Sequence, residues 1–140
     1  MIYLDTSLLV ALLCREPRSQ DLLVWLAGNP DQEFAISHWT QVEFASALSV
    51  KLRTAQISEA EANAAGTQFG ELVDGSVVTL ALNDQDYARA SDYCEAWRVG
   101  LRAPDALHLA IAQRTGCPLA TLDNGLYRAA RHFGIAALIP

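Results

Sequence analysis

The chain has 140 residues, 51% of them apolar, and a formal net charge of −6, which together predict one domain over residues 1–140 and exclude a disordered polypeptide. No stretch approaches the roughly 20 apolar residues that a membrane span needs, so we expect no membrane association. The three widely spaced cysteines indicate neither a disulfide framework nor a zinc site, and a reducing cytoplasm is the simpler interpretation.

Short apolar runs alternate with helical patterns along the whole chain. In chain order we expect a strand at 2–4, helices at 7–13 and 19–27, a strand at 34–36, helices at 39–53 and 58–73, a strand at 77–80, helices at 84–97 and 104–114, a strand at 119–122, a helix at 126–133 and a strand at 135–139. Strands separated by helices indicate βαβ units and a parallel sheet covered on both faces. The predicted fold class is therefore α/β, a three-layer α/β/α domain with a parallel sheet of about five strands, and the many helices indicate an extra helical subdomain at one edge.

Several helix details follow from residue types. In the stretch at 39–53, the apolar residues Val42, Ala45, Leu48 and Leu52 recur at helical spacing, which predicts a long helix. Ser58 and Glu61 have the spacing of a capping box. Pro104 is expected at the first position of its helix.

Four acidic residues, Asp5, Glu43, Asp105 and Asp123, stand where a strand or loop meets a helix. In a parallel α/β sheet such positions converge, because ligands bind outside the carboxyl ends of the strands. Converging carboxylates need a counter-charge, and an all-oxygen ligand set suits a hard cation such as Mg²⁺ or Mn²⁺. The constellation predicts metal-assisted hydrolysis of a phosphodiester.

Each acid also has a purely structural interpretation. Asp5 and Asp123 are plausible helix N-caps, and Asp123 is alternatively part of a turn with Asn124 and Gly125. Glu43 follows Thr40 at capping-box spacing, and Asp105 lies in a first turn, where acids favour the helix dipole. The interpretations are compatible, because helix N-termini aimed at one rim keep carboxylates ionised.

The net charge does not exclude a nucleic-acid substrate. Without the four candidate ligands, 12 acidic residues face 10 basic ones, and all the basic residues except Lys51 are arginine. Arginine binds phosphate through a bidentate fork, so a local phosphate-binding groove is possible. The alternative is that most of these arginines only keep helix surfaces soluble.

Four motifs of this chain resemble those of a PIN domain, and closely those of VapC-type toxins of bacterial toxin–antitoxin pairs. The resemblance covers the whole chain and rests on four motifs in order: Met1-Ile2-Tyr3-Leu4-Asp5-Thr6-Ser7, Trp39-Thr40-Gln41-Val42-Glu43-Phe44, Pro104-Asp105-Ala106-Leu107-His108-Leu109-Ala110 and Leu119-Ala120-Thr121-Leu122-Asp123.

The resemblance implies a Mg²⁺- or Mn²⁺-dependent endoribonuclease with Asp5, Glu43, Asp105 and Asp123 as the acidic ligand set. It implies that Thr6 and Thr121 orient carboxylates. It further implies an RNA substrate, a homodimer, and an antitoxin whose extended tail covers the acidic site.

Other residues near these motifs have two interpretations each. Arg102 is a candidate for gripping the scissile phosphate. His108 is either a hydrogen-bonded histidine beside the site or a proton-transfer group, and Trp39 either packs in the core or stacks an unpaired base. One surface edge, formed by the apolar residues of the helix at 19–27, is either ordinary core or a partner-binding edge; its members are Leu22, Leu23, Trp25 and Leu26.

The rival classes are binding modules. A phospho-accepting receiver domain also ends its first strand with aspartate, but here Asp5 has no acidic neighbour, the third strand ends at Leu80 without an aspartate, and the only lysine is Lys51. A PIN-like protein that binds a partner without cleaving is the second rival, and the presence of all four acids argues against it.

Overall fold

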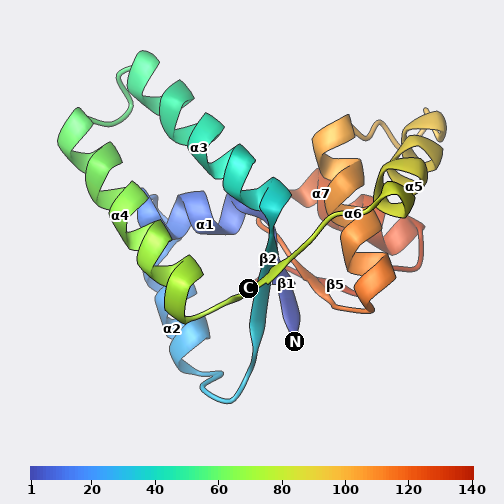
Figure 1. Cartoon of the computed structure of the whole chain (residues 1–140), viewed down its shortest axis with the longest axis horizontal. Helices are drawn as coiled ribbons and strands as arrows, with labels where there is room; N and C mark the ends of the chain where they lie inside the picture. The colour runs from blue at the N-terminus through green and yellow to red at the C-terminus, as the bar shows by residue number, and fades with distance from the viewer.

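The structure is a computed structural model that describes residues 1–140. Five strands form one parallel sheet: β1 (Ile2–Leu4), β2 (Phe34–Ser37), β3 (Val78–Leu80), β4 (Leu119–Ala120) and β5 (Ala137–Leu138). Their order across the sheet is β3-β2-β1-β4-β5, with β1 in the centre (Figure 1). The predicted parallel sheet of five strands is confirmed.

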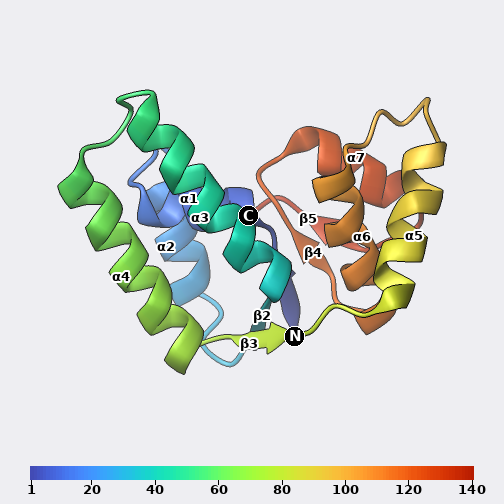
Figure 2. The ribbon, with the colours of Figure 1, turned by 45° about the horizontal axis from the view of Figure 1, so that its top comes forward.

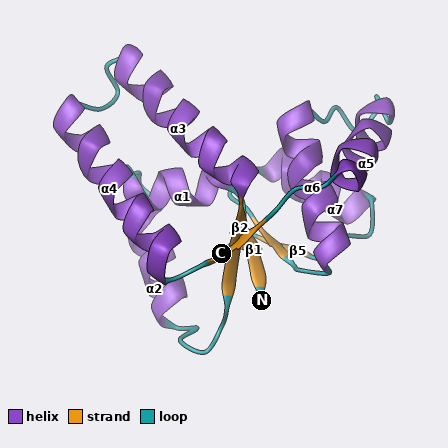
Figure 3. Ribbon diagram, viewed as in Figure 1, coloured by secondary structure: helices purple, strands orange, loops and turns teal.

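Seven helices cover the two faces of this sheet (Figure 3). They are α1 (Thr6–Leu13), α2 (Ser19–Ala27), α3 (His38–Arg53), α4 (Glu59–Gly75), α5 (Asp84–Glu95), α6 (Ala103–Thr115) and α7 (Asn124–His132). One group, α1 to α4, lies on one side of the sheet, and α5 to α7 lie on the other, so the three-layer α/β/α arrangement is confirmed. Helices α3 and α4 form a hairpin that projects from the sheet, in line with the predicted helical subdomain.

Each face of the sheet has its own apolar core. On the α1–α4 side, Leu8 and Leu9 of α1 pack with Phe44 of α3, and Phe44 stacks on Phe69 of α4 with ring centroids 4.1 Å apart. On the other side, the buried face of α6 packs against α5 and α7, with Leu109 and Ile111 fully buried. The two cores fix the sheet between them.

The pairing register brings the carboxyl ends of the central strands together. Tyr3 is opposite Ala35 of β2 and Leu119 of β4. The residue after β1, Asp5, donates its backbone N–H to the carbonyl of Ala120 at the end of β4. Residues that directly follow β1 and β4 therefore lie side by side, which is the geometry expected at the ligand-binding edge of a parallel sheet.

Helix α3 differs from its prediction in its start and in its capping box. It begins at His38, and its capping box joins Ser37 to Thr40, so the proposed box of Thr40 with Glu43 is wrong. The buried residues are Thr40 and Phe44, whereas Val42 is 59% exposed. Of the other apolar residues at helical spacing, Ala45 is also exposed, whereas Leu48 and Leu52 are partly buried.

Other boundaries moved by a few residues. The box of Ser58 with Glu61 is confirmed, and Pro104 occupies the second rather than the first position of α6. Helix α5 ends at Glu95 and leaves Trp97 in the following loop, where the prediction had kept it helical. Strands β4 and β5 are shorter than predicted, so that Thr121 lies just beyond β4.

The surface of α2 supports both interpretations of its apolar residues. Leu22 is fully buried and belongs to the core, whereas Leu23 is 51% exposed and Val24 is also exposed. Across the chain, no helix combines the length and apolar character required for a membrane crossing.

Candidate functional site

The four acids predicted as ligands come from four different elements. Asp5 directly follows β1 and is buried, although its side chain makes no cap hydrogen bond to α1. Glu43 lies in the second turn of α3, and Asp105 lies in the first turn of α6. Asp123 is the N-cap of α7, and its Oδ1 accepts the backbone N–H groups of Gly125 and Leu126. The N-cap interpretation of Asp123 is therefore confirmed.

The structure brings these acids to one place. Glu43, Asp105 and Asp123 line a single cavity of about 510 Å³, together with Arg102 and the loop before it. Burial raises the pKa of the Asp105 carboxyl, and the negative charges of Asp123 and Asp5 raise it further. Asp5 thus lies within electrostatic reach of the cavity, as the strand order requires. In Figure 2 the N-termini of α6 and α7 open toward the same end of the molecule.

Two hydroxyl groups hold the carboxylate of Asp5. Ser7 and Thr121 both donate to its Oδ2, at 2.5 and 2.7 Å. Ser7 in turn accepts the backbone N–H of Leu122 at 3.0 Å, so the carboxylate is tied to the chain after β4. Oδ1 remains available and lies 3.4 Å from Nε2 of His108. Thr121 was predicted to contact an acid, whereas Ser7 was not identified.

Glu43 is held by a threonine and a histidine. Thr6 donates to its Oε2 at 2.6 Å, and Nε2 of His108 lies 2.5 Å from the same oxygen. Burial alone raises the pKa of the Glu43 carboxyl, but the bond and positive charge of His108 and the bond from Thr6 outweigh burial, and the net shift is downward. The carboxylate is therefore kept ionised at the cavity wall.

His108 is fully buried beneath these acids. Its Nδ1 lies 2.8 Å from the hydroxyl of Tyr3, which also lies 2.8 Å from Oγ of Ser37. Burial lowers the pKa of His108, but the Tyr3 hydroxyl and the carboxylates of Glu43 and Asp5 outweigh it and raise the pKa to about 10. The hydrogen-bonded interpretation of His108 fits, because both ring nitrogens are engaged.

Sequence reasoning missed Tyr3 and Ser37 as parts of this site. A usable signal was present for Tyr3, since it is the only residue with a polar tip in the central apolar strand, and a buried tyrosine hydroxyl normally has a partner. Ser37 carried no such signal, because its contact with Tyr3 depends on the pairing of β1 with β2.

The polar groups of this site have the chemistry of a cation-binding site. One carboxylate oxygen of Asp5, one of Glu43 and a ring nitrogen of His108 lie within 4.8 Å of one another, which is close enough for a shared ion. His108 is already hydrogen-bonded through both nitrogens, so the free ligand atoms are carboxylate oxygens. The pKa of Asp105 is raised by burial and then by the charges of Asp123 and Asp5, and such neighbouring carboxylate oxygens match the demands of a hard divalent cation.

Trp39 and Arg102 differ in exposure. Trp39 packs against the core on the α6 side, and its buried indole Nε1 has no hydrogen-bond partner, so the core-packing interpretation fits better than base stacking. Arg102, the N-cap residue of α6, is exposed and lines the acidic cavity, as a phosphate-binding residue should.

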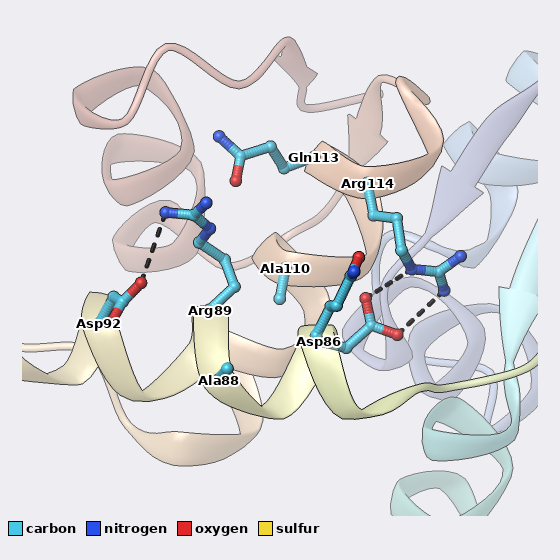
Figure 4. Close-up of a pocket in the computed structure, with 8 residues that line it drawn as sticks. Asp86, Ala88, Arg89, Asp92, Ala110, Gln113 and Arg114 are labelled. Carbon is cyan, nitrogen blue, oxygen red and sulfur yellow. Dashed lines mark hydrogen bonds and ion pairs between the residues drawn. The ribbon is translucent and has the colours of Figure 1, made fainter.

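A second cavity, of about 550 Å³, lies between α5 and α6 on the outer surface (Figure 4). Its charged groups are already paired. Arg114 donates from Nε and Nη2 to the two carboxylate oxygens of Asp86, at 2.6 and 2.9 Å, and Arg89 pairs with Asp92. Asp86 is 1% exposed, so this pair fastens α5 to α6 and leaves no free charge for a ligand.

Known proteins resemble this chain over nearly its whole length. The PIN domain family matches residues 2–132. Ribonuclease VapC35 of Mycobacterium tuberculosis is 30% identical to this chain over 145 aligned positions, covering all of this chain and 97% of the relative.

Two solved structures share the fold. FitAcB from Neisseria gonorrhoeae superposes with a TM-score of 0.72 at 21% identity, covering 99% of this chain and 96% of that one. A toxin–antitoxin complex from Klebsiella pneumoniae superposes with a TM-score of 0.57 at 18% identity, covering 88% and 87% of the two chains.

Proposed function

We propose a function for this chain, which belongs to the PIN domain family over nearly its whole length. The proposed function is that of a metal-dependent endoribonuclease acting as the toxin of a toxin–antitoxin pair. The full-length similarity to a ribonuclease supports the activity. The observation that carries the proposal is the convergence of Glu43, Asp105 and Asp123 on one cavity, with Asp5 held beside it.

The acids have distinct tasks in this proposal. Asp5, Glu43, Asp105 and Asp123 would hold Mg²⁺ or Mn²⁺, which when bound lowers the pKa of water and stabilises charge on a phosphodiester. Thr121 and Ser7 fix the orientation of the Asp5 carboxylate.

The remaining groups prepare the site and the substrate. Thr6 and His108 keep the Glu43 carboxylate ionised and immobile. The exposed guanidinium of Arg102, on the wall of the cavity, would bind the scissile phosphate and balance its charge against the nearby carboxylates.

A cleavage assay tests this function. Purified protein incubated with total RNA and Mg²⁺ or Mn²⁺ is expected to cleave it, and a chelator is expected to stop cleavage. Asp5→Asn is expected to abolish cleavage because it removes a charged ligand, while its circular dichroism spectrum stays unchanged. Asp21→Asn is the matched control, since Asp21 is exposed on α2 and pairs only with Arg18. Full activity of Asp5→Asn would contradict the assignment of the site.

An antitoxin partner and a homodimer belong to the same proposal. The similarity of the fold to a toxin–antitoxin complex supports a partner protein. An arginine of the antitoxin tail would take the charge-balancing place among the carboxylates. The exposed Leu23 and Val24 of α2 provide apolar surface for contact with a second chain.

The proposed location of the protein is the cytoplasm.

A further inference from the structure

Trp97 is a strongly exposed aromatic side chain outside the site described above. It lies in the loop between α5 and α6 and is 73% exposed, whereas the other two tryptophans, Trp25 and Trp39, are partly buried and pack against the cores. A large aromatic side chain on the surface keeps apolar area in water that folding has not removed. Such a side chain is a candidate for contact with a ligand.

The loop that carries Trp97 also forms a wall of the acidic cavity. Val99, Gly100, Leu101 and Arg102 line this cavity together with Glu43. Val99 and Leu101 anchor the loop by packing against the core. Figure 2 shows the loop joining α5 to α6 at the end of the molecule where α6 begins. Trp97 precedes Val99, the first residue of this loop that lines the cavity, by two positions along the chain.

The charges around Trp97 suit a polyanion. The guanidinium of Arg98 lies over the indole, 4.5 Å from the ring centroid. Arg98 and Arg102 are both exposed, and neither forms an ion pair within the chain. Two guanidinium groups without a carboxylate partner therefore follow Trp97 within one short loop, where they would meet successive phosphates.

The surroundings of Trp97 favour a nucleic acid over a protein surface. Its apolar neighbours in the loop, Ala96, Val99 and Leu101, are all partly buried, so the indole stands alone and is not the centre of an apolar patch. An isolated aromatic ring next to an arginine is typical of stacking sites for unpaired bases. Protein interfaces instead have an apolar centre with a polar rim.

We propose that Trp97 is a stacking platform for an unpaired base of single-stranded RNA, with Arg98 and Arg102 binding the phosphates that lead from that base into the acidic cavity. The proposal rests on the proposed ribonuclease function, because it supplies the substrate contact of the same site. Trp97 is a positioning residue in this scheme, since it orients the strand and touches no reacting atom.

Binding and turnover test the platform separately. The binding probe is a short fluorescein-labelled single-stranded RNA of mixed sequence, followed by anisotropy with Mg²⁺ in an Asp5→Asn background that does not cleave. Trp97→Ala is expected to weaken binding by about tenfold, the range for loss of one base–aromatic stack, and Trp97→Phe is expected to retain most of the affinity. In the cleaving protein, Trp97→Ala is expected to raise KM by a similar factor and leave kcat unchanged.

Two controls isolate stacking from general effects. Tyr87→Ala removes another exposed aromatic residue, on α5, and is expected to leave RNA binding unchanged. A fully base-paired form of the probe offers no unpaired base, so its binding is expected to be insensitive to Trp97→Ala.

The outcomes separate this proposal from the proposed function. Unchanged Kd and KM in Trp97→Ala would overturn the platform, even if the wild type cleaves RNA. A variant that binds RNA normally but loses its dimer or its antitoxin would also overturn it, and would assign Trp97 to a protein contact. Binding that depends on Trp97 in a wild-type protein that never cleaves would support the platform and contradict the ribonuclease function.

Discussion

The hydroxyl of Tyr3 and Nδ1 of His108 lie 2.8 Å apart and join the central strand β1 to helix α6. Tyr3 continues this chain of bonds to Oγ of Ser37 at the end of β2, and His108 continues it to the carboxylate of Glu43. All but Glu43 are fully or almost fully buried. The orientation of an acid on the cavity wall therefore depends on contacts made inside the sheet.

Tyr3→Phe tests this buried connection. The variant leaves Nδ1 of His108 and Oγ of Ser37 without the hydroxyl, and an unsatisfied buried polar group costs about 1–3 kcal/mol. We expect a loss of that size in the free energy of unfolding measured by urea denaturation. Tyr87→Phe is the control, because Tyr87 is exposed and its hydroxyl makes no hydrogen bond within the protein. Equal stability of the two variants would contradict a structural role for the Tyr3 hydroxyl.

The stability of the metal-free protein should depend on pH through His108. Its pKa in the folded protein is about 10, above the ordinary value of 6.5, because the effect of Tyr3, Glu43 and Asp5 exceeds that of burial. Protonated His108 therefore stabilises the fold fully below pH 6.5, and the stabilisation is lost as the pH rises toward about 10.

Chemical denaturation in a chelating buffer, repeated across this pH range, measures the effect. We expect His108→Gln to flatten the decline of the unfolding free energy with pH. His132→Gln, at the exposed end of α7, is the control and is expected to retain the decline. A wild-type protein whose stability is constant over this range would contradict the pairing of His108 with the acids.

Divalent metal should raise the melting temperature of the protein. Burial, and then the charges of Asp123 and Asp5, raise the pKa of Asp105, and a cation among these three carboxylates would offset the charge repulsion. A metal at ten times its Kd stabilises the native state by about 1.4 kcal/mol. Differential scanning fluorimetry with millimolar Mg²⁺ or Mn²⁺ is expected to show the shift, and Asp5→Asn is expected to reduce it. No shift of the wild type with either ion would exclude a shared site in the free protein.

Arg114 should matter more for stability than its surface position indicates. Its partner Asp86 is 1% exposed, so removal of the guanidinium leaves a buried carboxylate unpaired. We expect Arg114→Met to cost about 3 kcal/mol, as measured by urea denaturation. Arg89→Met serves as the matched control, because its partner Asp92 is exposed, and such a surface pair is worth at most about 1 kcal/mol. Similar losses in both variants would show that the two pairs are equivalent.

The partner prediction concerns the assembled protein. We expect the isolated chain to be at least a dimer in light scattering at micromolar concentration. Co-expression with the product of the adjacent upstream gene is expected to suppress RNA cleavage, because the antitoxin tail would cover the carboxylates. A monomer would contradict the first expectation, and undiminished cleavage by the purified complex would contradict the second.

Residue order along the chain was enough to predict the acidic site because of the parallel sheet. Asp5 and Asp123 follow β1 and β4, which are hydrogen-bonded neighbours, and Glu43 and Asp105 lie early in helices that leave the same edge. Ordinary strand and helix signals therefore located four residues that are distant in sequence. Thr121, by contrast, was predicted from the family resemblance, and it lies between β4 and Asp123.

The contacts beneath the acids could not be predicted in this way. Ser7 binds Asp5, two residues away, but its role depends on Leu122, whose position is set by the pairing of β1 with β4. The helix end before Trp97 was missed because no glycine or proline interrupts the helical pattern until Gly100. That small error in a boundary concealed the exposure of the indole.

The α5–α6 loop has an anchored part and an exposed part. Val99 and Leu101 pack against the core, whereas Trp97 and Arg98 are exposed, and Arg98 forms no ion pair with an acid of the cavity. If the chain has the proposed function, substitutions at these exposed positions would change its affinity for RNA without altering the four acids. Related proteins would then tune substrate affinity through this loop while retaining the same acidic residues.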